Sequence, residues 1–248
     1  MTIANDKFQI RMLTAKDDLD EVYRLRHHVF VREMGARAVN VGATNQEADA
    51  FDAFSRHLTL WDRSRDVGDQ LVGTYRIMDR QAANRAGGFY CEAEYDLSKV
   101  LGASDAVLEL GRSCIHADYR GSAAILHLWD ALKNLIAHEQ IDYLFGVASF
   151  PGTDRTAIAD ALSLLHHEFR AAQNIRPISR VPVKMDLKSP QELDRKLAIL
   201  QMPTLIKAYL RNKALVGEGA YIDHQFNTID ICMVMRTADN LAQQGPTK

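Results

Sequence analysis

The sequence predicts an α/β fold in which a mixed central sheet is flanked by helices, and three observations support this prediction. A strand, a turn and a helix follow one another between Val107 and Ile136. Polar and apolar residues are interleaved from Val107 to Ile115, and apolar residues then recur at helical spacing from Ile125 onward. Strand-like segments lie on both sides of this unit in the sequence, so we expect its strand to be central in the sheet.

Gly111 lies inside that central strand, and a glycine within a strand often marks a β-bulge. Regular alternation would place Glu109 and Arg112 on opposite faces of the sheet. The extra residue of a bulge turns the side chains that follow it and frees backbone N–H groups for a ligand. The alternative for Glu109 and Arg112 is a structural ion pair within the sheet.

The N-terminal elements are predicted to be a strand over 8–12 and then a helix. Thr14 and Asp17 resemble a capping box, apolar residues follow at helical spacing, and Gly35 ends the pattern. Arg26 is the charged residue on this apolar stripe. It requires a buried partner or a ligand, unless its stem covers apolar surface while its head reaches water, which is the more common arrangement.

Two carboxylates, Asp49 and Asp52, end a long polar segment over 36–50 and precede a predicted strand over 55–62. Such a pair can bind an ammonium group, although its ordinary role is a solvated turn. A further strand is expected over 70–79, and residues 80–102 are expected to be irregular.

The C-terminal half is predicted to contain a buried strand over 141–149, a helix over 154–172 and a final hairpin from strands at 220–223 and 228–236. His166 and His167 would point about 100° apart on that helix, so we interpret them as structural residues and not as a metal pair.

Two C-terminal segments combine charge and hydrophobicity in different ways. Basic residues are concentrated from Arg176 to Lys196, which favours either a docking site for an acidic partner or a solvated face. The apolar segment over 197–215 also carries basic residues, and it fits a core helix first and a membrane-surface helix second.

The composition argues against several classes of protein. A formal net charge of −2 provides no overall basic excess for nucleic acid. The three cysteines lie far apart without a Cys-x-x-Cys pair, so we expect neither a disulfide framework nor a zinc site, and no metal. There is no apolar signal core and no run of roughly 20 apolar residues. We therefore expect a cytoplasmic protein, soluble or peripheral to a membrane.

Seven motifs, taken in order, resemble the ornithine-acyl carrier protein N-acyltransferases, which share the acetyltransferase-like (GNAT) fold. The motifs are Leu25–Gly35, Asp49–Asp52, Val72–Arg76, Gly87–Tyr90, Glu109–Ser113, Asp142–Gly146 and Ala148–Gly152. The resemblance extends from about residue 8 to Met235. It implies a single GNAT-like domain over 1–248, with 176–236 as a family-specific extension of that domain and 237–248 as a polar tail.

A shorter likeness, over residues 20–115, is to the acyl-homoserine lactone synthases, a sister group that uses the same donor. It implies that a set of charged and aromatic residues lines the substrate cleft, namely Arg26, Phe30, Asp49, Asp52, Arg76, Glu109 and Arg112. In those synthases a serine precedes the arginine that is Arg112 here. This chain has Gly111 instead, which argues against a homoserine lactone product.

The resemblance and the residue chemistry together suggest how an amino acid would be acylated. Glu109 is the expected base for the α-amine, and Asp52 is next in line. Backbone N–H groups at the bulge would hold the oxyanion. Arg112 or Arg76 would hold the carboxylate of the amino acid, with Ser113 in the same site. Asp49 and Asp52 would meet a cationic side chain.

The acyl donor would be held at the start of the predicted central helix, where free N–H groups and the helix dipole favour a phosphate. The residues expected to bind the acyl-pantetheine arm are Ile115, Tyr119, Arg120, Gly121 and Ser122. We expect no cofactor beyond the phosphopantetheine thioester of acyl carrier protein. Arg120 and the segment from Arg176 to Lys196 would dock that acidic carrier.

The resemblance implies transfer of a 3-hydroxy fatty acyl group from acyl carrier protein to the α-amine of ornithine. The product would be lyso-ornithine lipid, made in the cytoplasm or at the periphery of the inner membrane. Three alternatives stay open: the same chemistry on another amino acid such as glutamine, acyl-homoserine lactone synthesis from S-adenosylmethionine, and a non-catalytic module that binds acyl groups or a membrane.

Overall fold

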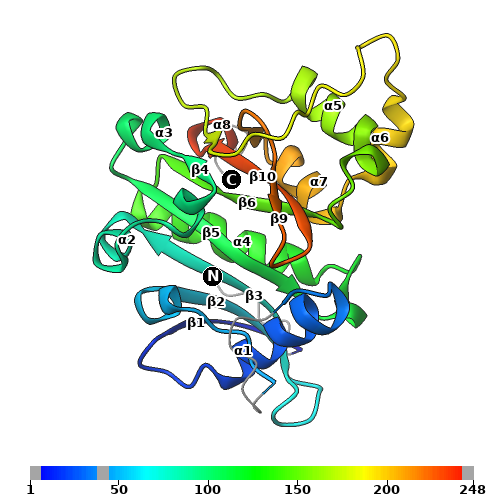
Figure 1. Ribbon diagram of the computed structural model, residues 1–248. Coiled ribbons are helices and arrows are strands. Elements are labelled where there is room, and N and C mark those ends of the chain that lie inside the picture. Colours follow the sequence, from blue (N-terminus) through cyan, green and yellow to red (C-terminus); the bar gives the residue numbers. More distant parts are fainter. Residues whose placement is uncertain (1–6, 38–44, 242–248) are drawn as a thin grey trace, which may run out of the picture. The chain divides into compact units, whose positions relative to one another are not determined.

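The computed structural model describes residues 7–37 and 45–241 (Figure 1). The chain divides into two compact units. The first comprises residues 1–88 and 109–140, and the second comprises residues 89–108 and 141–248. Each unit is therefore assembled from segments that are distant in the sequence.

The first unit is built on antiparallel strands. Strand β1 (Phe8–Thr14) pairs with β2 (Arg56–Asp62), and β2 pairs with β3 (Leu71–Asp79). The strand β5 (Val107–Ile115), whose last seven residues belong to this unit, follows β3 in the strand order. The central strand predicted from the sequence is thus present with its predicted bounds.

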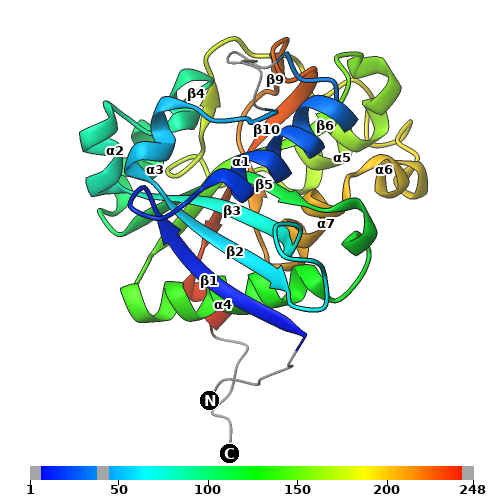
Figure 2. The ribbon, with the colours of Figure 1, turned by 90° about the horizontal axis from the view of Figure 1, so that it is seen from below.

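Two long helical segments pack against these strands, as Figure 2 shows for α1 and α4 on opposite sides of the β1–β3 ribbon. Helix α4 (Ala124–Glu139) buries Leu128, Trp129, Leu132 and Ile136, which confirms the predicted helical spacing. Helix α1 (Asp20–Arg26) continues as a π-helical turn, η1 (His27–Glu33), and the left-handed Gly35 follows it, as predicted.

The predicted capping box of α1 is wrong. The N–H and hydroxyl groups of Thr14 both donate to the carboxylate of Asp17, but this contact closes a turn that ends before the helix begins at Asp20. The first turn of the helix carries Asp20 and Glu21 instead, where negative charge is favourable.

The prediction of irregular structure over 80–102 is also wrong. This stretch contains α2 (Arg80–Ala86), the 3₁₀ turn η3 (Tyr90–Ala93), the short strand β4 (Tyr95–Asp96) and most of α3 (Ser98–Ala103). The side chain of Asp79 caps α2 by accepting the N–H of Ala82, and the left-handed Gly87 ends it. These elements are only two to seven residues long, so none of them is long enough to produce a clear periodic pattern of apolar residues in the sequence.

The second unit is organised around a long antiparallel pair, β6 (Tyr143–Pro151) and β10 (Thr228–Arg236). Strands β8 (Leu215–Val216) and β9 (Tyr221–Asp223) also pair with β10, and the β9–β10 pairing confirms the predicted hairpin. A separate small ladder joins β4 to β7 (Ile178–Ser179).

Helices complete the second unit. The predicted helix over 154–172 is shorter than expected, because it begins as a 3₁₀ turn, η5 (Arg155–Ile158), and its α-helical part α5 spans Ala159–Glu168. Helix α6 (Arg195–Gln201) packs on α5, α7 (Thr204–Arg211) begins after Pro203, and α8 (Ala238–Leu241) follows β10. Within the described ranges, no helix combines the length and the apolar character needed to cross a bilayer.

Candidate active site

Arg26, at the end of α1, lies at the centre of the candidate site. Its side chain is fully buried. Its Nε donates to Oε2 of Glu47 at 2.5 Å, and its Nη1 donates to Oδ1 of Asp52 at 2.7 Å. The more common arrangement expected from the sequence, with the guanidinium reaching water, is therefore wrong, and the alternative of a buried partner is confirmed.

Two further arginines extend this pair into a network. Arg76, from β3, donates from Nη1 to Oδ1 of Asp49 at 2.6 Å and to Oδ1 of Asp52 at 3.1 Å. Arg112, from β5, donates from Nε to Glu47 at 3.1 Å and from Nη2 to Asp49 at 2.8 Å. The charge network, defined as Arg26, Glu47, Asp49, Asp52, Arg76 and Arg112, balances three positive charges with three negative charges.

Local backbone chemistry places the two aspartates. They flank the start of the 3₁₀ turn η2 (Ala50–Phe54), where the side chain of Asp49 accepts the N–H of Phe51 at 2.9 Å. The side chain of Asp52 accepts the N–H of Asp49 at 2.8 Å. Because the side chain of Asp52 is only 2% exposed, the solvated-turn interpretation of these residues is wrong.

The network controls the protonation of its members. Burial alone would raise the pKa of Asp52, but the adjacent guanidinium groups of Arg26 and Arg76 outweigh burial and hold its pKa well below the ordinary value. Arg76 and Arg112 have the same effect on the pKa of Asp49 against the opposing effect of burial. Both aspartates are therefore anionic at neutral pH, and neither is suited to removing a proton from an amine.

His57, on β2, is a member of this neighbourhood that the sequence did not reveal. Its side chain is completely buried, and its Nε2 lies 4.0 Å from Oδ1 of Asp52. Burial lowers the pKa of His57 to about 4; attraction to Asp52 opposes this shift, and repulsion from Arg26 and Arg76 reinforces it. The imidazole is thus neutral at neutral pH and adds no charge to the network.

The regular geometry of β5 is broken at Arg112, three residues after Glu109. Arg112 has a φ of 48°, in the left-handed region that a non-glycine strand residue seldom adopts. The first four residues of β5, Glu109 included, are buried, whereas Gly111, Arg112 and Ser113 are partly exposed. The expected irregularity is therefore present, and it falls one residue after Gly111.

Gly111 itself has room for a side chain. A Cβ atom built there would have Arg76 as its nearest neighbour, with Nε at 3.9 Å, an ordinary van der Waals contact. Packing would therefore allow a serine at this position, which is the residue found there in the lactone synthases. Tyr75, on β3, is buried, and burial raises the pKa of its hydroxyl to about 12.

The turn before α4 places the residues expected to bind the thioester. The hydroxyl of Ser122 donates to the carbonyl of Tyr119 at 2.7 Å and accepts the N–H of Ala124 at 3.1 Å. Gly121 is left-handed. This hydrogen bonding gives the turn, which follows the 3₁₀ segment η4 (Ala117–Tyr119), a defined backbone conformation.

The side chains of this turn already have partners within the first unit. The Tyr119 hydroxyl donates to Asp62, and Arg120 donates from Nη2 to Glu33 and from Nε to the carbonyl of Ile115 at 3.1 Å. Ile115 also faces Gly73 of β3, where its Cδ1 would lie 2.7 Å from an added Cβ. These contacts hold the side chains of the turn in place, and the backbone N–H groups of Tyr119, Arg120 and Ser122 also donate within the turn.

The structure brings together five of the residues selected from the sequence: Arg26, Asp49, Asp52, Arg76 and Arg112. Phe30 lies buried in η1, close along the chain to Arg26. Sequence reasoning missed Glu47 and His57. Glu47 lies in a polar segment without periodicity, and His57 is one ordinary residue of a strand, so nothing in the sequence distinguished either of them.

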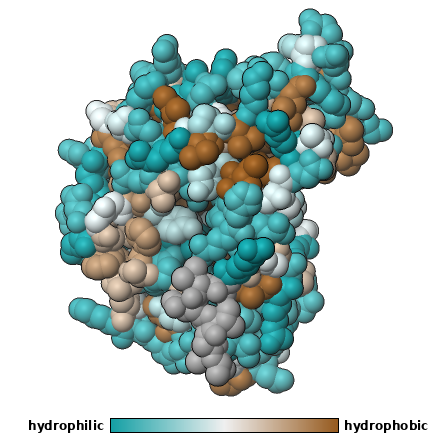
Figure 3. All heavy atoms as spheres, viewed as in Figure 1, coloured by the Kyte–Doolittle hydropathy of each residue, from teal (hydrophilic) through white to brown (hydrophobic). Residues whose placement is uncertain are grey.

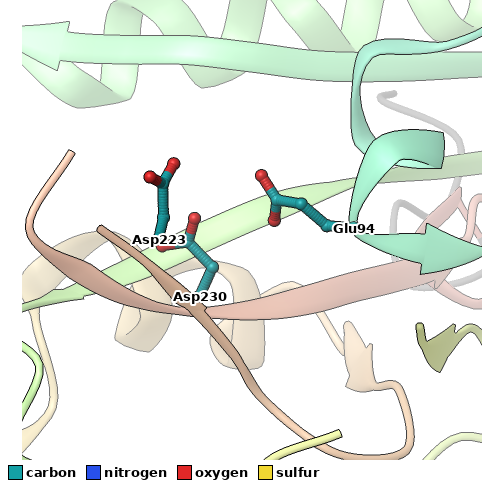
Figure 4. A group of neighbouring side chains, drawn as sticks. All are labelled: Glu94, Asp223 and Asp230. Atoms are coloured by element: carbon teal, nitrogen blue, oxygen red, sulfur yellow. The ribbon is translucent and has the colours of Figure 1, made fainter. Parts of the chain in front are cut away.

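In the described residues, one group of acids is close enough to share a metal ion. Glu94, Asp223 and Asp230, all in the second unit, have carboxylate oxygens within 4.8 Å of one another, and Figure 4 shows them converging. Oxygen ligands of this type suit hard cations such as Ca²⁺ or Mg²⁺. Asp223 also accepts the N–H groups of Gln225 and Phe226, so this acid has a structural role in the turn between β9 and β10.

The basic segment from Arg176 to Lys196 is largely compensated by acids. Arg176 donates to Glu218 at 2.9 Å, and Lys188 donates to Asp160 at 2.6 Å. Arg195 pairs with Glu168. The segment therefore presents much less net positive charge than its composition suggests.

Comparisons with known proteins agree with this fold. Residues 25–130 match the acetyltransferase (GNAT) domain family. The crystal structure of the acyl-homoserine lactone synthase LasI superposes with a TM-score of 0.54 at 15% identity, covering 97% of this chain and 98% of that chain. The synthase BjaI, solved with S-adenosylmethionine and isopentyl-CoA, gives 0.53 at 16% identity, with 97% and 91% coverage. The predicted GNAT-like α/β fold, a mixed central sheet flanked by helices, is thus confirmed. The family match together with the curated relatives described next shows that the protein is an N-acyltransferase.

Curated relatives define the family more closely. An L-ornithine N(alpha)-acyltransferase of Rhodobacter capsulatus is 42% identical over 240 residues, covering 96% of this chain and 93% of its own length. A protein of the same name from Brucella abortus is 37% identical over 234 residues, with 92% and 83% coverage. The chain belongs to the L-ornithine N(alpha)-acyltransferase family.

We predict that Asp52→Asn strongly destabilises the first unit. The substitution leaves the buried guanidinium of Arg26 with one negative charge too few, and breaking a buried pair in this way costs about 3–5 kcal/mol. The free energy of unfolding, measured by chemical denaturation, should fall by this amount. Asp130→Asn is the control, because its pair with Lys133 is exposed and 3.9 Å long, and such pairs contribute about 1 kcal/mol or less. Equal losses in both variants would contradict the role assigned to the network.

His57 should make stability depend on pH. Below the ordinary pKa of 6.5 the unfolded chain binds a proton at this residue, while the folded protein excludes it until pH is near 4. Stability therefore falls as pH is lowered through this window, by at most about 1.4 kcal/mol per pH unit. Between about pH 7 and pH 5, the free energy of unfolding of the His57→Phe variant should therefore fall by about 1–2 kcal/mol less than that of the original protein. Parallel stability curves for the two proteins would show that His57 does not titrate in this way.

Proposed function

We propose that the protein transfers a 3-hydroxy fatty acyl group from acyl carrier protein to the α-amine of ornithine and so forms lyso-ornithine lipid. The curated relatives, which carry the name L-ornithine N(alpha)-acyltransferase over nearly the whole chain, support ornithine as the acceptor. The resemblance of the seven sequence motifs supports acyl carrier protein as the donor. The observation that carries the mechanism is the break in β5 at Arg112, a member of the charge network that lies three residues after the buried Glu109.

Glu109 is the proposed base. The amine is protonated at neutral pH and must lose a proton, directly or through a water, before its nitrogen can attack the thioester carbonyl. Asp52 is a poor base, because its two arginine partners stabilise the anionic form. The attack forms the amide bond, the carbon–sulfur bond breaks, and the pantetheine thiol leaves with a proton. Backbone N–H groups at the break in β5 would hold the oxyanion, each contributing about 2.7–4 kcal/mol.

The exposed edge of the charge network is the proposed contact with the amino acid. Side-chain exposure rises from 0% at Arg26 to 9% at Arg112 and 22% at Asp49, so these last two residues are the members that a ligand can reach most easily. Arg112 would bind the carboxylate of ornithine, and Asp49 would bind an ammonium group. In this proposal Arg26 and Arg76 do not bind the amino acid themselves. Arg26 holds Glu47, which is a partner of Arg112, and Arg76 holds Asp49.

The proposal is tested by supplying the purified protein with 3-hydroxyacyl carrier protein and either ornithine or glutamine, and identifying the product by mass spectrometry. N-acylornithine as the main product supports it. N-acylglutamine as the main product would show that glutamine, and not ornithine, is the acceptor. Methylthioadenosine released from added S-adenosylmethionine would indicate lactone synthesis instead, and turnover with acyl-CoA alone would remove the carrier protein from the proposal.

Glu109→Gln should lower kcat about a hundredfold or more, because a neutral amide cannot accept the proton. The KM for ornithine should change little, since the proposed contacts at Arg112 and Asp49 remain. The control is Asp130→Asn, an exposed acid on α4 that should leave kcat unchanged. Near-normal turnover by a folded Glu109→Gln variant would exclude Glu109 as the base.

A further inference from the structure

Helix α6 presents an apolar face to solvent. Of its seven residues only Ala198 is buried, whereas Leu197, Ile199 and Leu200 are 41%, 47% and 69% exposed. Hydrophobic spheres accordingly stand among hydrophilic ones at the upper right of Figure 3, where Figure 1 places α6. Three adjacent large apolar side chains on the outside of one short helix are uncommon on a protein surface and mark a site of contact.

The same segment carries positive charge without acids. Residues 195–213 contain five basic residues and no Asp or Glu. Arg195 pairs with Glu168, but four of the basic residues have no acidic partner in the described part of the chain. These four are Lys196, Lys207, Arg211 and Lys213. This is a different situation from the preceding basic segment, whose charges are mostly compensated.

The geometry of α7 keeps its charges on the outside. Ile206 and Tyr209 are buried and fix one face of the helix to the unit. Lys207 and Arg211, four residues apart, lie together on the side away from Ile206. In α6, Lys196 lies four residues before Leu200 and on the same side away from the buried Ala198. Apolar and cationic side chains are thus interleaved on one continuous segment, the α6–α7 surface, defined as residues 195–213.

We propose that the α6–α7 surface docks the protein on a bilayer that contains anionic lipids. Apolar side chains that protrude from a short helix can enter the boundary between headgroups and acyl chains, while flexible lysine and arginine side chains keep their charges at the anionic headgroups. A membrane accepts such side chains without a matching pocket, whereas a protein partner must supply one.

Docking would also suit the reaction. If the proposed function holds, the product has a hydrocarbon chain attached to an amino acid with a carboxylate and an ammonium group. Such an amphiphile partitions into a bilayer. A protein already at the membrane surface can release such a product directly into it. This benefit rests on the proposed function, but the docking surface is argued from α6 and α7 alone.

The test is co-sedimentation of the full chain with vesicles of phosphatidylcholine, with and without phosphatidylglycerol. We expect binding to the anionic vesicles that is about tenfold or more stronger than to the neutral ones and that weakens with salt. The combined substitution of Leu197, Ile199 and Leu200 by Ser should lower the partition coefficient about tenfold. The combined substitution of Lys196, Lys207, Arg211 and Lys213 by Gln should remove the preference for anionic lipid.

The matched control is the double variant Val67→Ser and Leu126→Ser, which removes two apolar side chains of 95% and 59% exposure from the first unit. It should bind vesicles as the original protein does. The proposal is overturned if the original protein shows no preference for anionic vesicles, or if the α6 variant and the control bind equally.

A carrier protein is the competing occupant of this surface. If the α6 variant instead loses kcat/KM for the acyl carrier protein donor in buffer without vesicles, while its vesicle binding is unchanged, the α6–α7 surface belongs to the carrier and the proposal is overturned. Vesicle binding requires no substrate. Absence of turnover would therefore remove the proposed function alone, and absence of vesicle binding would remove this inference alone.

Discussion

Burial of the Arg26 guanidinium is the constraint on which the first unit depends. A charged group without access to water costs several kcal/mol unless opposite charges and hydrogen bonds replace its hydration. Glu47 and Asp52 provide both, at 2.5 and 2.7 Å. Because each of these acids also meets a second arginine, a helix, two strands and the segment before η2 are tied to one another through ionised groups. Such a network contributes less to net stability than to fixing a single arrangement of its members.

The network also explains how β5 can hold an unusual backbone conformation. A non-glycine residue in the left-handed region costs of the order of 1–3 kcal/mol and persists only where the surroundings enforce it. The side chain of Arg112 is held at both ends of its guanidinium, by Glu47 and by Asp49. The backbone conformation on which the proposed chemistry depends is therefore held by side-chain contacts to Glu47 and Asp49.

Ion pairing determines how much net positive charge a basic segment presents at the protein surface. The segment from Arg176 to Lys196 is basic in composition, yet Glu218, Asp160 and Glu168 from other parts of the second unit neutralise much of it. Residues 195–213 contain four basic residues that have no acidic partner among the described residues, on the same segment as the exposed Leu197, Ile199 and Leu200. The proposed docking on an anionic bilayer therefore depends on unpaired positive charge together with exposed apolar side chains, and not on the number of lysines and arginines.

The sequence by itself determined the regular elements whose side-chain periodicity is strong: the strand over 107–115, the helix that follows it, and the C-terminal hairpin. It also identified five members of the charge network, because their residue types and order resemble a known family. Only the tertiary structure decided that Arg26 is fully buried, that Glu47 and His57 belong with it, and that α6 turns its leucines outward. The physical reason is that burial and ion pairing depend on segments far apart in the chain, whereas periodicity depends on residues that are close in the sequence. The residues around Glu47 therefore do not reveal that it pairs with Arg26.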